Sequence, residues 1–155
     1  MIPLLLFFHI GSAVLLVGEI LFASIWLRSS ISRRSDAAVT RYVIATMAVT
    51  SRGIAMPAFV VNLASGVTLS IFGDVHWSRA IWLILSIVLY SIMASLWHGT
   101  LIPLRNRMAQ MLESAGQGPL PADYEASARQ WVRISGAVLM LFLAIFALMI
   151  WRPTI

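Results

Sequence analysis

Residues 4–27 form an almost wholly apolar stretch, LLLFFHIGSAVLLVGEILFASIWL, which is long enough to cross a bilayer as a helix. Its only ionisable side chains are His9 and Glu19. Ionisable residues inside a span are costly, so they usually face the interior of a helix bundle and mark a site. The stretch therefore predicts a membrane protein whose function depends on a few polar groups within its spans.

Three further apolar segments follow the first, at about residues 53–72, 80–104 and 134–151. The chain is 60% hydrophobic and 11% charged, whereas a soluble domain carries about 25% charged residues. The sequence predicts an all-α integral membrane four-helix bundle that forms a single domain over residues 1–155. A helical extension at about 37–52 and a loop region at about 105–130 are expected on the cytoplasmic side. We find no internal repeat between the two halves of the chain.

The basic residues are all arginines, and their distribution predicts the orientation of the bundle. Four spans place both termini on one side of the membrane. Only Arg79 and Arg152 fall on that side, and the other side carries Arg28, Arg33, Arg34, Arg41, Arg52, Arg105, Arg107, Arg129 and Arg133. Because arginine-rich loops stay in the cytoplasm, both termini are expected outward, in the periplasm of a bacterial inner membrane. The net charge of +5 then reflects topology, and we expect no nucleic-acid partner.

The first group of polar residues lies toward the outer side. His9 is about 8 Å below the outer end of the first span at about 1.5 Å per residue. It is level with the loop that carries His76 and Arg79. A neutral imidazole here is either a haem or metal ligand, with Arg79 near a haem propionate, or an interfacial histidine bonded to a backbone carbonyl.

The second group lies in the inner leaflet. Glu19 is about 12 Å, and His98 about 9 Å, from the inner end of its own span. A carboxylate in hydrocarbon must be neutral or paired, and His98 or Arg52 is the expected partner. This polar group is a structural pair that locks the first span to the third, a proton or metal site, or an unpaired, neutral Glu19.

Several sequence motifs resemble a group of bacterial membrane families. The first span has a histidine near its outer end followed by glycines (His9, Gly11, Gly18), and the second has a proline followed by a glycine (Pro57, Gly66). The third span opens with Trp82 and Leu83, and the chain closes with MIWRP at residues 149–153. The chain is similar to a family of bacterial predicted integral membrane proteins. That family is related to HemJ-type protoporphyrinogen oxidases and CopD-like copper-resistance domains.

The resemblance implies that His9 is a haem b ligand, because the matching histidine has that role in the HemJ type. That type also needs a lysine early in the third span. The position falls near Ser86 here, and the chain contains no lysine, which argues against HemJ-type activity.

The sequence thus predicts haem-linked redox or tetrapyrrole chemistry, at most that of a haem-dependent membrane oxidoreductase. The alternative is a non-enzymatic accessory subunit or a protein that handles metal ions such as copper. The bilayer is the expected partner, and assembly into a homo-oligomer or a larger membrane complex is open.

Overall fold

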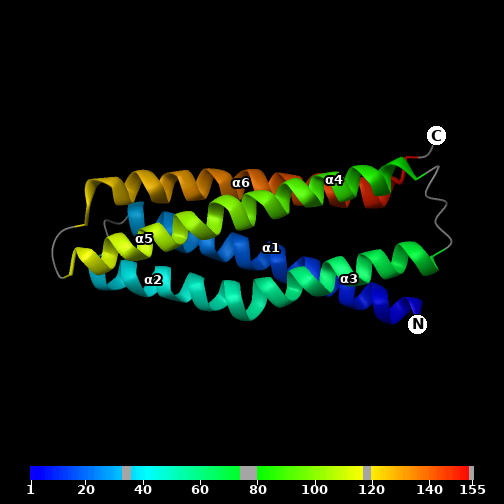
Figure 1. Ribbon diagram of the computed structural model, residues 1–155, viewed down its shortest axis with the longest axis horizontal. Helices are drawn as coiled ribbons and strands as arrows, with labels where there is room; N and C mark the ends of the chain where they lie inside the picture. Colours follow the sequence, from blue (N-terminus) through cyan, green and yellow to red (C-terminus); the bar gives the residue numbers. More distant parts are fainter. Residues whose placement is uncertain (33–35, 74–79, 117–119, 154–155) are drawn as a thin grey trace.

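The computed structural model describes residues 1–32, 36–73, 80–116 and 120–153. Long helices run the length of the molecule, and both termini lie at the same end (Figure 1). The elements are α1 (Ile2–Ser32), α2 (Ala37–Thr50), η1 (Ser51–Ala55), α3 (Met56–Phe72), α4 (Ile81–Leu96), η2 (Trp97–Leu101), α5 (Ile102–Ser114) and α6 (Ala122–Trp151). The predicted all-α membrane bundle is confirmed.

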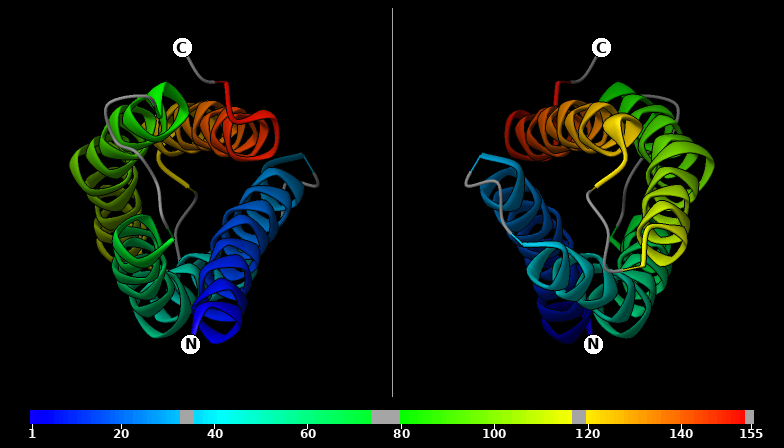
Figure 2. Two further views of the ribbon diagram at one scale, coloured as in Figure 1. Left: turned by 90° about the vertical axis from the view of Figure 1, so that its right-hand side faces the viewer. Right: turned by 90° about the vertical axis from the view of Figure 1, so that its left-hand side faces the viewer.

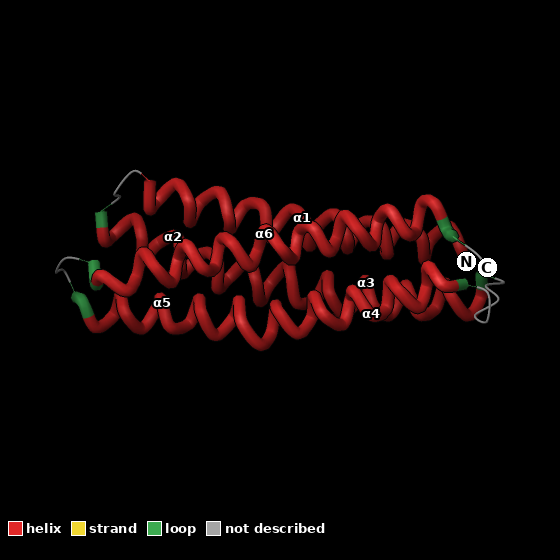
Figure 3. Tube along the Cα trace, turned by 90° about the horizontal axis from the view of Figure 1, so that it is seen from above, coloured by secondary structure: helices red, strands yellow, loops and turns green. Residues whose placement is uncertain are grey.

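Four helical rods make up this bundle. The second rod runs through α2, η1 and α3 without a break, and the third through α4, η2 and α5 (Figure 3). All four rods are long and apolar enough to cross a membrane. They extend beyond the predicted spans. Much of the expected loop at 105–130 is helical, because α5 continues to Ser114 and α6 already begins at Ala122.

The outer surface of the bundle is apolar and carries little charge. Large hydrophobic side chains such as Phe7, Phe22 and Ile150 are exposed on the outside. A water-soluble protein does not expose so continuous an apolar surface, whereas lipid tails solvate it. The buried side chains include small residues such as Ala13, Ala58 and Ser135, which allow close approach of the helices.

Polar contacts between helices supplement this packing. The hydroxyls of Ser24 on α1 and Ser135 on α6 lie 2.8 Å apart. Between the second and third rods, the rings of Phe59 and Tyr90 stack at 4.9 Å, and the Tyr90 hydroxyl donates to the Phe59 carbonyl. Toward the end that carries the termini, α3 and α4 diverge, as Figure 1 and the end-on views of Figure 2 show.

The second and third rods each contain one π-helical turn, η1 and η2. In η1 the Met56 N–H donates to the Ser51 carbonyl, and in η2 the Ile102 N–H donates to the Trp97 carbonyl. Each turn is followed by a proline, Pro57 or Pro103. A proline inside a helix lacks an N–H and its ring clashes with the carbonyl four residues earlier, and a π-helical turn relieves that conflict.

The two π-helical turns share a local sequence pattern that our search for repeats missed. Residues 52–57 read RGIAMP and residues 98–103 read HGTLIP, so each has a basic residue and a glycine, with a proline four residues after the glycine. The glycine is the residue whose carbonyl faces the proline ring. Such turns are frequently found at functional sites.

Candidate functional site

The outer site is formed where α1 packs against α3. The Nδ1 atom of His9 lies 3.0 Å from the Asn62 carbonyl oxygen and 3.1 Å from the Ser65 hydroxyl. The Asn62 side-chain amide returns to α1, donating to the His9 carbonyl (2.9 Å) and the Ser12 hydroxyl (3.2 Å). The network holds the imidazole in one orientation and joins the two helices in the outer half of the bundle.

The hydrogen bonds of His9 define its tautomer. A carbonyl oxygen only accepts, so the Asn62 contact requires a proton on Nδ1. The Ser65 hydroxyl donates to the carbonyls of Val61 (2.6 Å) and Asn62 (3.1 Å), which leaves its oxygen to accept from the imidazole. In the neutral ring the lone pair is therefore on Nε2, and within the described residues Nε2 has no hydrogen-bond partner.

The absence of a side chain at Gly66 makes room for this ring. A Cβ at that position would lie 2.9 Å from Cε1 and 3.4 Å from Nδ1 of His9. Real Cβ atoms do not approach that closely, so the position requires glycine while His9 keeps its place.

Of the other residues predicted at the outer site, only Arg152 falls within the described residues. His76 and Arg79 lie outside the described residues. Arg152, the second arginine predicted at the outer side, caps the C-terminal end of α6 and lies over the Trp82 ring at 5.6 Å. The described residues contain no group of three or more His, Cys, Asp or Glu side chains that could hold a metal ion.

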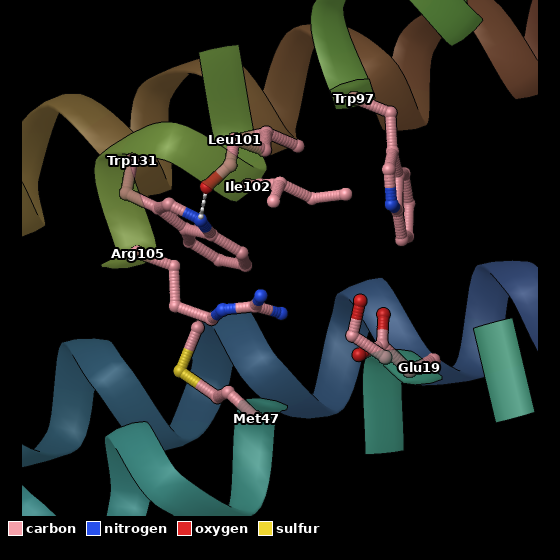
Figure 4. Close-up of a pocket in the computed structure, with 8 residues that line it drawn as sticks. Glu19, Met47, Trp97, Leu101, Ile102, Arg105 and Trp131 are labelled. Carbon is pink, nitrogen blue, oxygen red and sulfur yellow. Dashed lines mark hydrogen bonds between the residues drawn. The ribbon is translucent and has the colours of Figure 1, made fainter. Parts of the chain in front are cut away.

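The inner site is a small pocket at the centre of the bundle, with a volume of about 20 Å³. All four rods contribute to its wall, which includes both π-helical turns (Figure 4). The lining residues are Glu19, Met47, Ser51, Trp97, Leu101, Ile102, Arg105 and Trp131. The Trp131 indole N–H donates to the Leu101 carbonyl at 3.1 Å, so α6 supplies a hydrogen bond to the end of η2.

The carboxylate of Glu19 has different partners from those predicted. One of its oxygens accepts a hydrogen bond from the Thr50 hydroxyl at 3.2 Å. The basic group that faces it across the pocket is Arg105, whose side chain is buried with 6% exposed (Figure 4). The two charges do not form a direct salt bridge; in the described part of the chain, the ion pair within 4.0 Å joins Arg129 and Glu125.

The predicted group of Glu19, His98 and Arg52 therefore needs correction. Trp97 points into the pocket, and the next residue on a helix lies about 100° further round, so His98 is exposed and meets Phe59 edge-on at 5.6 Å. Arg52 is also exposed. Counting residues predicts the depth of a side chain along the helix axis, but it does not predict the direction in which the side chain points around that axis.

Thr50 and Arg105 were missed at the inner site, and Asn62 and Ser65 were not connected to His9. The clearest signal available was the repeated basic–Gly–x–x–x–Pro pattern, because it marks the turns on either side of the pocket. Arg105 lies two residues after the second of these prolines. The distribution of arginines along the sequence predicts Arg105 on the cytoplasmic side of the membrane.

The fold and the two polar sites define a class, the multi-pass integral membrane proteins with four spans and polar groups enclosed by the bundle. The chain belongs to the DUF2269 family of predicted integral membrane proteins, whose family model matches residues 3–153. No curated protein and no solved structure matches the chain. A relationship to the HemJ or CopD families thus has no support beyond the motifs described above.

Proposed function

We propose that this protein binds haem b through Nε2 of His9 and acts in redox or tetrapyrrole chemistry in a bacterial inner membrane. One observation carries the proposal: Nδ1 of His9 is bonded to acceptors only, Asn62 and Ser65. A histidine that ligates a metal almost always donates its other ring N–H to a carbonyl or a comparable acceptor, which fixes the tautomer and the ring plane.

The position of His9 fits such a group in one respect. The Nε2 lone pair has no competing partner within the described residues, and His9 is only partly buried. Bound haem b would supply a one-electron redox centre.

The contribution of this chain is to hold the His9 imidazole in position. Asn62 and Ser65 hold the proton on Nδ1, and Gly66 leaves the room that the ring needs. A reaction of the HemJ type is not proposed, because the chain contains no lysine. Copper handling is favoured less, because no cluster of metal-ligating side chains is present in the described ranges.

The test is the absorbance spectrum of the full chain, purified in detergent after expression with ample haem. We expect a Soret band that is lost in His9→Ala and kept in His98→Ala, the matched control with an exposed histidine on the third rod. A colourless wild-type protein would overturn the haem proposal and favour a non-enzymatic accessory role. A band that survives in His9→Ala would overturn the assignment of the ligand.

A further inference from the structure

The pocket between the π-helical turns encloses two charges that are not fully paired. Arg105 donates through Nη2 to the Asn106 side-chain oxygen at 3.1 Å. Its Nε is buried and has no hydrogen-bond partner among the described residues. Glu19 accepts a single hydrogen bond from the described residues, which reaches one of its two oxygens from Thr50. A donor and an acceptor therefore remain free on opposite walls of the same small space.

The size of the pocket fits one water molecule. Its volume of about 20 Å³ exceeds the roughly 10–15 Å³ that a cavity needs to hold a single water. A buried water also needs two to four polar partners, and the unpaired Arg105 Nε and Glu19 oxygen supply two. Apart from Ser51, the remaining wall is mostly apolar, with Met47, Trp97 and Ile102 among its residues, and the volume leaves no room for a larger polar solute.

The pocket lies in the inner half of the bundle. Glu19 is about 26 Å along α1 from Ile2 and about 20 Å from Ser32, at about 1.5 Å per residue. The charged group that faces Glu19 is Arg105 of α5, and the exposed Arg52 of η1 lies near Arg105, not in the pocket wall. From η2 and α6 the pocket receives the uncharged Trp97 and Trp131.

We propose that one water molecule occupies this pocket, bridges Glu19 and Arg105, and lets the Glu19 carboxyl exchange protons with the cytoplasmic side. When the carboxylate takes a proton from the bridging water, that water takes one from the solvent on the cytoplasmic side, and the reverse steps release it. No covalent bond other than O–H is made or broken. The proposal does not depend on haem binding, because it rests on different residues.

The water is tested by hydroxyl-radical labelling of the full chain in lipid nanodiscs. Radicals formed from a bound water oxidise the side chains beside it. Met47 lines the pocket and is 3% exposed, whereas Met93 and Met108 are equally buried, at 1% and 0%, but do not line it. We expect Met47 to be oxidised several-fold faster than both reference residues. Equal rates would overturn the bound water.

A double variant asks whether the two charges hold the water. Glu19→Leu with Arg105→Met makes the pocket apolar, and replacing both members of a buried charge pair by apolar residues is often tolerated. We expect the Met47 rate to fall to that of Met93. If Met47 stays labelled at the wild-type rate while the far-ultraviolet spectrum is unchanged, the water is not held by this pair.

Proton exchange has its own readout in infrared difference spectra recorded over about pH 4 to about pH 9. We expect a protonated-carboxyl C=O band that grows on acidification, shifts in D₂O, and disappears in Glu19→Gln. Glu113→Gln is the matched control, since Glu113 is exposed on α5. A band that is absent, or one that does not respond to D₂O, would overturn the exchange.

Discussion

At the scale of single residues, the outer site depends on the close contact between the His9 imidazole and Gly66, which has no side chain. His9 contributes the ring, Asn62 and Ser65 orient it, and Gly66 leaves space for it. The histidine could be selected from sequence because an ionisable residue in an apolar span is unusual. Its partners could not, because serine, asparagine and glycine are common in membrane helices for packing alone.

Gly66→Ala is expected to displace the His9 ring, because the new Cβ would lie 2.9 Å from Cε1. Overpacking of this kind costs about 1–3 kcal/mol, so the thermal midpoint in detergent should fall, together with haem content if haem is bound. Gly11→Ala is the control, since a Cβ there meets nothing within 4 Å. Equal midpoints for the two variants would contradict the close approach of His9 to Gly66.

At the scale of elements, the π-helical turns explain how two prolines sit inside long membrane helices. Each turn shifts the hydrogen-bonding pattern of its rod before the proline, Pro57 or Pro103. Trp131 of α6 donates to the Leu101 carbonyl at the end of η2 and so ties this turn to the fourth rod.

Trp131→Phe is expected to destabilise the bundle by about 1–3 kcal/mol, since it removes the side-chain donor to a buried carbonyl while keeping an aromatic ring. The measurement is the thermal midpoint of the full chain in detergent. Trp151→Phe serves as the control, because Trp151 is exposed at the end of α6. If both substitutions lower the midpoint by the same amount, the bond to Leu101 adds nothing specific.

At the scale of the whole molecule, α1 begins and α6 ends at one end of the bundle, and α1 ends and α6 begins at the other (Figure 1). The rods are longer than the hydrocarbon core requires. At about 1.5 Å per residue, the third rod, Ile81–Ser114, extends about 50 Å, against a core of about 30 Å. The parts of the rods that extend beyond the hydrocarbon core carry most of the arginines. They lie on the side that the positive-inside rule assigns to the cytoplasm.

The orientation can be measured with single cysteines, because the chain has none of its own. Pro153→Cys, Ser32→Cys and Ser114→Cys all introduce a thiol at an exposed position. In intact spheroplasts we expect a membrane-impermeant maleimide to label only Pro153→Cys, and to label the other two after lysis. Labelling of the serine positions in intact spheroplasts would reverse the predicted topology.

The sequence by itself determined the number of spans, the all-α class, the expected orientation and the two ionisable positions of the first span. A bilayer leaves little choice here, because every span must be long, apolar and helical, and arginines remain in the cytoplasm. Only the tertiary structure decided that Glu19 faces Arg105 instead of His98. Counting residues gives the height of a side chain in the membrane, whereas its direction depends on helix packing. One extra residue in a π-helical turn rotates everything after it by about 100°.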